Sequence, residues 1–249
     1  MNNIKPKEYD NNIDYASPYH WNIDRSDLNG GVEYFGYIEL VANKCKELAS
    51  KKILDVGCGD GKATDVIQKI TNADVTGIDI SDRAIAFAQL LSAKPAFKNI
   101  NIFDIEDSFD TVIMIEVLEH LEADMALKFL KKIYQIMKDS GSLIITVPSN
   151  LFPMLHPGHV RHFNKNDLEK VLNSSGFIIK EVIFQHNMLF DRRFGISFPI
   201  RTMLRLLSSR FFKSSVLDRV LSKIYNKYFN ITIEKYAGRI IAIAKKGNL

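Results

Sequence analysis

The residues best suited to chemistry in the first half of this chain form a glycine-rich turn. Gly57, Gly59 and Gly61 occupy every second position after a short apolar run that contains Asp55. Glycine allows positive φ and lets a ligand lie against the backbone, and a helix starting after the turn would offer free N–H groups. The pattern predicts a nucleotide-type site. The spacing fits neither the G-x-G-x-x-G dinucleotide fingerprint nor the G-x-x-x-x-G-K-[ST] phosphate loop.

Histidines supply a second kind of chemistry. His120 follows one predicted strand, and His156, His159 and His162 follow the next. Imidazole titrates near neutral pH and therefore suits a general base. We expect His120, His159 or His162 to play this role. A spacing of three in a segment with Pro153 does not place histidines on one face, so the pattern does not favour zinc.

These residues must be positioned by strands that alternate with helices. Apolar runs predict strands at 52–56, 73–78, 99–103, 111–115, 143–147, 177–184 and 239–244. Helices are expected at 34–48, 63–70, 82–91, 123–137 (ended by Gly141) and 167–172. This alternation implies right-handed crossovers and an α/β fold with a doubly wound, seven-stranded, mostly parallel sheet. Such sheets bind ligands at the carboxyl ends of their strands.

Two segments lie outside this repeat. Residues 1–33 form an N-terminal cap segment, while 34–185 together with 238–249 form the sheet domain. Residues 186–237 are expected to be a basic helical insertion before the last strand, with helices at 200–207 and 216–228. Residues 191–228 contain nine Lys and Arg residues but only two Asp. We expect this insertion to be a lid over an anionic acceptor, a homodimer interface, or a surface for peripheral membrane contact.

Composition narrows the class of protein. The chain has 249 residues, of which 46% are hydrophobic and 25% charged, as in globular proteins. Two cysteines without a C-x-x-C pair, a polar N-terminus and no long apolar run lead us to expect a cytoplasmic protein. Nucleic-acid-binding domains typically have a pI above about 9. The pI of this chain, about 8.9, is below that value, and no RNA-binding motif is present, so we do not expect a nucleic-acid partner.

The motifs resemble those of class I S-adenosylmethionine-dependent methyltransferases. The similarity includes the glycine turn, the segment 75–81 with its acid Asp79, the segment 103–105, and 109–120, which is similar to F-D-x-V-x-x-x-x-x-L-E-H. The resemblance implies that S-adenosylmethionine is the cofactor and that Asp79 holds the two ribose hydroxyls. The cofactor-binding residues it implies are Asp55, Gly57, Gly59, Gly61, Asp79, Ile80, Asp104, Ile105 and Glu116, with Asp104 taking the adenine amino group.

This resemblance covers roughly residues 35–185 plus the last strand. It is closest to the ubiquinone-pathway, sugar and small-molecule O-methyltransferases, and it implies a Rossmann-like methyltransferase fold. The function it implies is O-methylation of a small molecule, such as a sugar or an activated or phosphorylated carbohydrate. We expect no metal in the site.

Two alternatives remain open. The E-x-x-E-H run from Glu116 to His120 resembles the segment through which RNA 3′-terminal ribose methyltransferases hold a divalent metal, which would make this a metal-assisted enzyme for RNA ends or another diol. In that case the metal ligands would be Glu116, Glu119 and His120, together with either His159 or His162. The other alternative is a cofactor-binding protein that acts at a membrane surface. The segment containing Tyr19, His20, Trp21 and Arg25 is expected either to cover the cofactor or to pack the N-terminus.

Overall fold

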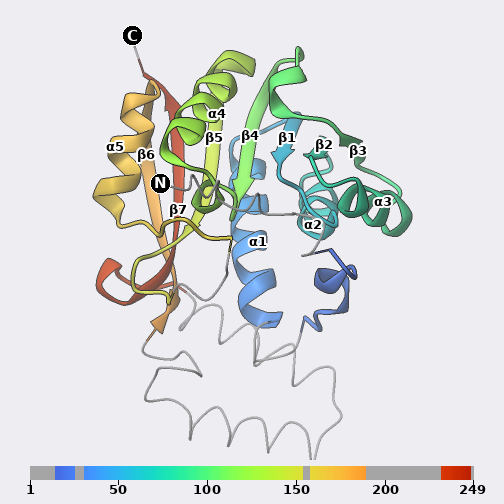
Figure 1. The fold of residues 1–249 in the computed structure, drawn as a ribbon, viewed down its shortest axis with the longest axis horizontal. Coiled ribbons are helices and arrows are strands. Elements are labelled where there is room, and N and C mark those ends of the chain that lie inside the picture. Colours follow the sequence, from blue (N-terminus) through green and yellow to red (C-terminus); the bar gives the residue numbers. More distant parts are fainter. Residues whose placement is uncertain (1–14, 26–30, 154–157, 189–230, 248–249) are drawn as a thin grey trace, which may run out of the picture.

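A seven-stranded sheet forms the centre of the molecule (Figure 1). The computed structural model describes residues 15–25, 31–153, 158–188 and 231–247. The strands are β1 (Lys52–Val56), β2 (Asp74–Asp79), β3 (Ala96–Asn99), β4 (Phe109–Ile115), β5 (Met137–Pro148), β6 (Phe177–Asn187) and β7 (Ala237–Lys246), in the order β3-β2-β1-β4-β5-β7-β6. Strands β1 to β5 pair in parallel, and β7 runs antiparallel to both β5 and β6. The predicted doubly wound, mostly parallel fold is confirmed.

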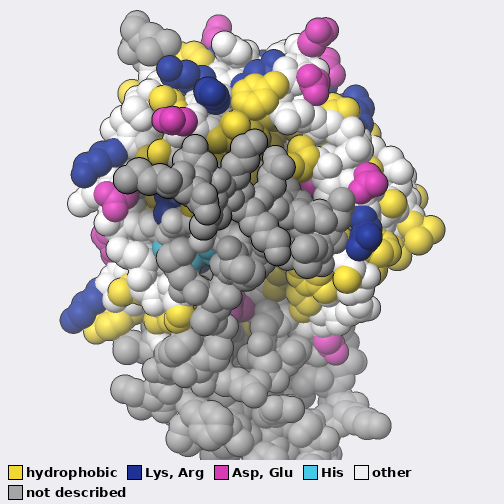
Figure 2. Space-filling view, in the orientation of Figure 1, with side chains coloured by type: hydrophobic (Ala, Val, Ile, Leu, Met, Phe, Trp, Pro, Cys, Tyr) yellow, Lys and Arg dark blue, Asp and Glu magenta, His cyan; other side chains and the backbone are white. Residues whose placement is uncertain are grey.

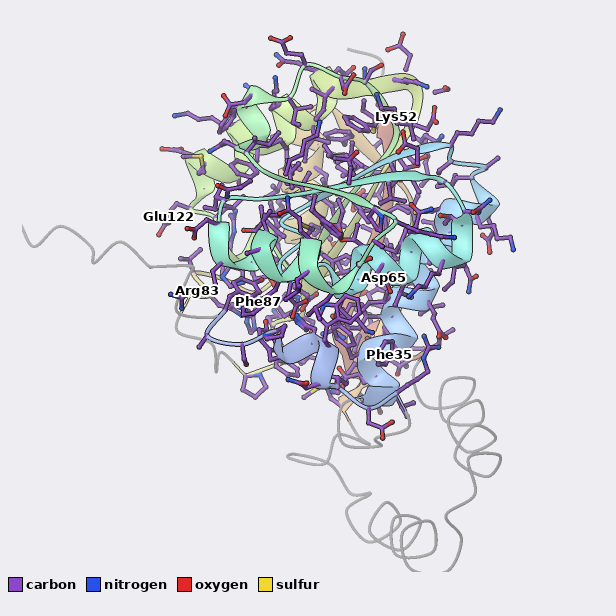
Figure 3. All side chains as sticks on the ribbon, turned by 90° about the vertical axis from the view of Figure 1, so that its right-hand side faces the viewer. Phe35, Lys52, Asp65, Arg83, Phe87 and Glu122 are labelled. Atoms are coloured by element: carbon purple, nitrogen blue, oxygen red, sulfur yellow. The ribbon has the colours of Figure 1, made fainter. Side chains whose placement is uncertain are left out.

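Helices cover both faces of this sheet. They are α1 (Gly31–Glu47), α2 (Lys62–Thr71), α3 (Asp82–Leu91), α4 (Ala123–Ile136) and α5 (Lys165–Ser174), with 3-10 turns η1 (Tyr19–Asn22), η2 (Ile102–Asp104), η3 (Leu118–His120) and η6 (Glu234–Tyr236). Figure 3 views the molecule from the β3 edge and labels Phe35 on α1, Asp65 on α2 and Phe87 on α3. The Ser81 hydroxyl caps α3 by accepting from the Ala84 N–H at 3.1 Å.

Strand side chains alternate between two hydrophobic cores. Ile53 and Ile113 pack with residues of α1 and α2, whereas Leu54, Val56 and Met114 pack with residues of α4 and α5. Strands buried on both faces read as continuous apolar runs, which is why the sequence reveals them so clearly. The two cores hold the carboxyl ends of β1, β2 and β4 together at one edge of the sheet.

Two sequence predictions about elements are wrong. The third strand covers Ala96–Asn99 instead of 99–103, because its partner β2 ends at Asp79, which pairs with Asn99. The chain then leaves the sheet and forms η2, whose cap Asn101 accepts from the Phe103 N–H at 3.2 Å.

The helix predicted over 123–137 ends at Ile136, and Gly141 lies within β5 instead of ending a helix. The β4–β5 register shifts between Phe109 and Thr111, and a Cβ on Gly141 would lie only 2.6 Å from the Met137 Cγ. This glycine therefore serves a strand irregularity.

Most of the predicted basic insertion, including the expected helices at 200–207 and 216–228, lies outside the described residues. Over the described part of the face in Figure 2, acidic and basic side chains are interspersed. None of the described helices is both long enough and apolar enough to span a membrane.

Candidate active site

Two adjoining cavities open at the carboxyl ends of β1, β2 and β4. The first is lined by Tyr15, Val56, Gly57, Ile78, Asp79, Ile80, Ile100, Ile102, Glu116, Val117, His120, Leu121 and Phe129. The second is lined by Tyr15, Tyr19, His20, Tyr34, Tyr37, Asp55, Gly57, Cys58, Gly59, Asp60, Ala63, Ile115, Glu116, His120 and His159. Tyr15, Gly57, Glu116 and His120 line both. The cavities thus bring together most of the predicted cofactor-binding residues and two of the predicted catalytic histidines, His120 and His159.

The glycine turn connects β1 to α2 in a conformation that requires glycine. Gly57 and Gly59 have φ of +73° and +54°, a region that L side chains rarely adopt. A Cβ on Gly57 would lie 2.6 Å from the Val117 Cγ2, and one on Gly59 would collide with the Tyr15 hydroxyl. The missing Cβ atoms therefore make room for other parts of the chain as well as for the cavity. Gly61, at the start of α2, allows close contact with α3 and β3.

Asp79 stands at the end of β2 with its carboxylate tied to the backbone on both sides. Its Oδ2 accepts from the Gly59 N–H at 2.9 Å and its Oδ1 from the Ser81 N–H at 2.9 Å. Burial raises the pKa of Asp79, although these backbone bonds act in the opposite direction. Asp79 and Ile80 both line the first cavity, and a carboxylate oxygen can accept more than one hydrogen bond. A fixed carboxylate of this kind can accept from a vicinal diol.

Asp104 and Ile105, two of the predicted cofactor-binding residues, lie outside the two cavities. Asp104 is exposed at the end of η2, and Ile105 is buried in the core that includes α4. Neither lines either of these two cavities, and the apolar wall of the first cavity includes Ile100, Ile102 and Phe129. The shift of β3 toward the N-terminus accounts for this difference, and the adenine role of Asp104 stays a prediction.

Asp55 is a buried carboxyl at the floor of the second cavity. Thr64 on α2 donates to its Oδ2 at 2.6 Å, and its Oδ1 has no hydrogen-bond partner among the described residues. Burial raises the pKa of Asp55 from 3.8 to about 7. The Asp55 carboxyl therefore gains or loses its proton near neutral pH. Its hydrogen bond from Thr64 also joins β1 to the start of α2.

Glu116 occupies the junction of the two cavities with an unusual backbone. It is a non-glycine residue with φ of +54°, directly after β4. Arg239 of β7 grips its carboxylate, with Nε at 3.1 Å from Oε1 and Nη2 at 3.4 Å from Oε2. Thr146 of β5 donates to the same Oε1 at 2.8 Å. The carboxylate is therefore engaged by protein groups.

The histidines form a chain of hydrogen bonds. His162 donates from Nδ1 to the Phe152 carbonyl at 2.8 Å, because a carbonyl oxygen can only accept. In the neutral ring, Nε2 of His162 then accepts from His159 Nδ1 at 2.9 Å. This leaves the lone pair of His159 on Nε2. By the same reasoning His120 donates from Nδ1 to the Gly158 carbonyl at 3.1 Å and carries its lone pair on Nε2. His162 lines neither cavity.

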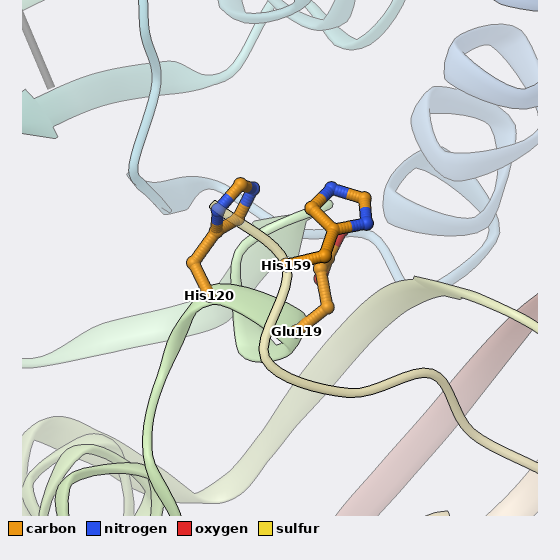
Figure 4. Close-up of side chains that lie close together, drawn as sticks. All are labelled: Glu119, His120 and His159. Carbon is orange, nitrogen blue, oxygen red and sulfur yellow. The ribbon is translucent and has the colours of Figure 1, made fainter. Parts of the chain in front are cut away.

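A buried glutamate completes this group (Figure 4). Glu119 is fully buried, and neither carboxylate oxygen has a hydrogen-bond partner among the described residues. Burial raises its pKa well above the usual range, and the nearby Glu116 carboxylate adds to this. Ligand atoms of Glu119, His120 and His159 all lie within 4.8 Å of one another. Three such groups could hold a metal ion.

The N-terminal segment contacts the glycine turn at Asp60 and Gly59. The His20 N–H and ring Nδ1 lie 3.1 Å from the two Asp60 carboxylate oxygens, and Trp21 Nε1 donates to the Asp60 carbonyl at 2.8 Å. Tyr15 from the same segment lies against Gly59 and lines both cavities. These contacts support the interpretation that residues 15–25 cover the site.

Sequence reasoning missed Arg239, Tyr15 and Asp60. Asp60 lies inside the quoted glycine motif, where an acid between two glycines is a signal for a side chain turned toward a neighbour. Arg239 has a weaker signal, a cation entering an otherwise apolar strand. Arg25, expected near the cofactor, pairs with Glu39 of α1 and lines neither cavity.

Comparisons with known proteins agree on one family. A family model described as "Methyltransferase domain" matches residues 33–182. A probable S-adenosylmethionine-dependent methyltransferase of Mycolicibacterium smegmatis is 24% identical over 152 residues, 57% of each chain. The mitochondrial ubiquinone biosynthesis O-methyltransferase of Bos taurus is 35% identical over 112 residues, 41% of this chain and 30% of that protein. This chain therefore aligns with between 30% and 57% of the length of these two relatives.

Solved structures share the fold. The crystal structure of an S-adenosylmethionine-dependent methyltransferase from Clostridium acetobutylicum superposes with a TM-score of 0.60. The match covers 92% of this chain and 98% of that one, at 15% sequence identity. A likeness at this identity confirms the Rossmann-like methyltransferase architecture.

Proposed function

This chain belongs to the methyltransferase-domain family, and we propose that it transfers a methyl group from S-adenosylmethionine to an oxygen of a small molecule. The observation that carries the proposal is the fixed Asp79 carboxylate and the glycine turn on one side of a cavity junction, with His120 and His159 on the other. The relatives in Mycolicibacterium smegmatis and Bos taurus support the donor and the oxygen acceptor, respectively.

The residues of the donor site fit an S-adenosyl group. Asp79 would hold the ribose hydroxyls, Ile80 and Phe129 would flank the adenine, and Gly57 and Gly59 would let the methionine portion lie against the backbone. When bound, the sulfonium supplies a methyl group on a leaving group that already carries positive charge. The chain's task is then to hold donor and acceptor in line, and proximity of this kind lowers the barrier by several kcal/mol.

His159 is the residue we propose as general base. Its Nδ1–H donates to His162, which fixes the tautomer with the lone pair on Nε2, the atom that would accept a hydroxyl proton from an acceptor. His162 fixes the tautomer of His159 through its own bond to the Phe152 carbonyl. His120 lines both cavities and would contact the acceptor beside the transferred methyl. The three predicted catalytic histidines thus take three different roles.

The acceptor class we propose is a small hydroxylated molecule, with a sugar or an activated carbohydrate as an example. The basic insertion at 186–237 would act as a lid or as an interface. The described residues that line the cavities include Asp55, Asp60 and Asp79 but no Lys or Arg. The support for an anionic acceptor is therefore the positive charge of the insertion alone.

A transfer assay tests this function. The chain is incubated with methyl-labelled S-adenosylmethionine and a panel of phenols, sugars and sugar phosphates, and the label is followed into an acceptor. We expect transfer that S-adenosylhomocysteine inhibits, with the label released from an O-methyl ether as methyl iodide by hydriodic acid. Binding of S-adenosylhomocysteine without transfer to any acceptor would favour a cofactor-binding protein, which liposome flotation with and without residues 191–228 would then examine.

The cluster of Glu119, His120 and His159 favours a second candidate, metal-assisted methyl transfer to a diol such as an RNA 3′ end. An unpartnered buried carboxylate beside two imidazole lone pairs suits a divalent ion such as magnesium or manganese. Glu116 is the least suited of the ligands predicted for this alternative, because Arg239 and Thr146 hold its carboxylate.

Metal titration separates the two candidates. The metal-assisted candidate expects Mn²⁺ to bind the wild-type chain in a calorimeter and chelator to abolish turnover while S-adenosylhomocysteine affinity is kept. Glu119→Gln would lose Mn²⁺ binding, whereas Glu122→Gln, at an exposed position just after η3, would retain it. Turnover unchanged by chelator removes this candidate and leaves the histidine-base reaction.

A further inference from the structure

Arg239 is the most heavily engaged charged residue near the site, and the proposed reaction does not use it directly. Its side chain is only 13% exposed. Besides Glu116, Arg239 Nη1 donates to Glu33 of α1 at 3.2 Å and to Gln185 of β6 at 2.9 Å. Its guanidinium also lies over the ring of Tyr37, 4.0 Å from the centroid. One side chain on β7 therefore joins the end of β4, helix α1 and strand β6, and two of its partners, Glu116 and Tyr37, line the second cavity.

The partner that matters most for the site is Glu116. A glutamate with φ of +54° adopts a conformation that costs free energy and persists only when its surroundings determine it. The Glu116 N–H is held by the Thr146 carbonyl at 3.1 Å, and its carboxylate is held by the forked guanidinium of Arg239. A guanidinium fork fixes both the position and the orientation of a carboxylate.

The left-handed residue sets the course of the chain that follows. After Glu116, Val117 packs against the space left by Gly57, and η3 then presents Glu119 and His120. His120, four residues after the turn at Glu116, lies at the junction of the two cavities. An extended residue at position 116 would continue the direction of β4 and carry η3 away from the glycine turn.

We propose that Arg239 is a positioning residue: by clamping Glu116 in the left-handed conformation, it fixes the turn that places His120 at the junction of the two cavities. Among the described residues, Arg239 lines neither cavity, and it reaches the site through its contacts with Glu116 and Tyr37. This inference rests on the proposed function for its effect on turnover, but not for its effect on the place of His120.

The test follows the imidazole signals of His120 by ¹H–¹⁵N NMR in the full chain, assigned by their loss in His120→Gln. Arg239→Met removes the fork and should shift these signals. Thr146→Val removes the hydroxyl that donates to the Glu116 carboxylate and accepts from the Glu116 N–H. It should shift these signals less and in the same direction, and it serves if Arg239→Met fails to fold. Lys246→Met is the matched control, because Lys246 also lies on β7, pairs with Asp139 and lies over a tyrosine ring. It should leave the His120 signals in place.

A double variant distinguishes positioning from general support of the fold. Glycine adopts positive φ without a clamp, so Glu116→Gly combined with Arg239→Met should return the His120 signals toward their wild-type positions. A structural role alone predicts no such rescue. His120 signals that are unmoved in both Arg239→Met and Thr146→Val, or as strongly shifted in the double variant as in Arg239→Met, would overturn the inference.

Turnover gives the second readout. Misplacing a catalytic group by about 1 Å costs about 100-fold in rate, so Arg239→Met should lower kcat by about that factor while S-adenosylhomocysteine affinity stays at the wild-type value. An unchanged kcat would contradict the inference. A wild-type chain that methylates nothing, with His120 signals that respond as described, would remove the proposed function and leave the positioning role standing.

Discussion

The two halves of the site are held in place by contacts of different range. The proposed donor half, formed by the ends of β1 and β2 with the glycine turn, includes the backbone bonds that Asp79 accepts from Gly59 and Ser81, 20 and 2 positions away. The acceptor half, formed by Glu116, η3 and the histidines, depends on distant partners. Arg239 lies 123 positions from Glu116 and 206 from Glu33.

This difference separates binding from turnover. A donor site built from local backbone geometry keeps its shape if a distant strand is disturbed. An acceptor site that depends on β5, β6, β7 and α1 is sensitive to changes far from it. Variants in the donor half should therefore change donor affinity, and variants in the acceptor half should change kcat.

The largest effect is expected in the acceptor half. His159→Ala should lower kcat by about 10²- to 10⁴-fold, the usual contribution of a general base, with no change in S-adenosylhomocysteine affinity. Lys170→Ala, at an exposed position on α5, is the control and should behave as wild type. Transfer kinetics and calorimetry measure both quantities. Turnover retained in His159→Ala but lost in His120→Ala would contradict the choice of His159 as base.

In the donor half, Asp79→Ala should weaken S-adenosylhomocysteine binding by about 100-fold. Two charge-assisted hydrogen bonds to the ribose would be lost, on the order of 3 kcal/mol together. Asp74→Ala changes an exposed aspartate at the other end of β2 and should bind as wild type. Calorimetric titration decides the matter, and equal affinities in the two variants would break the proposed division between the halves.

A smaller, pH-dependent effect is expected for Asp55. Burial raises its pKa from 3.8 to about 7 in the folded chain. Its contribution to stability is therefore full below pH 4 and is lost as the pH rises toward 7, because the unfolded chain releases its proton first. The loss is on the order of 4 kcal/mol at most. Asp55→Asn, which still accepts from Thr64, should flatten this dependence. Urea unfolding between pH 4 and 8 measures it, and parallel curves would contradict the assignment.

The places of the glycine turn and of Asp79 could be predicted from the sequence because their signals are local. Three glycines with forced positive φ and an acid at the end of an apolar strand specify the same geometry wherever they occur. Asp104 and Ile105 show the limit, since their placement depended on where β3 pairs with β2. An apolar run alone does not set that register.

The acceptor half could be predicted only in part. His120 and His159 were found because they follow strands, but the division of roles between His159 and His162 depends on a bond to the Phe152 carbonyl. The place of Arg239 beside Glu116 follows from β7 lying antiparallel next to β5, a pairing between strands about 100 residues apart. No local pattern encodes such a contact.

A crystal structure with S-adenosylhomocysteine bound tests the central claim most directly. We predict the ribose hydroxyls on the Asp79 carboxylate and the sulfur at the junction shared by Gly57 and His120, pointing toward His159. A nucleoside bound elsewhere, or a sulfur directed away from both histidines, would contradict this assignment of the site.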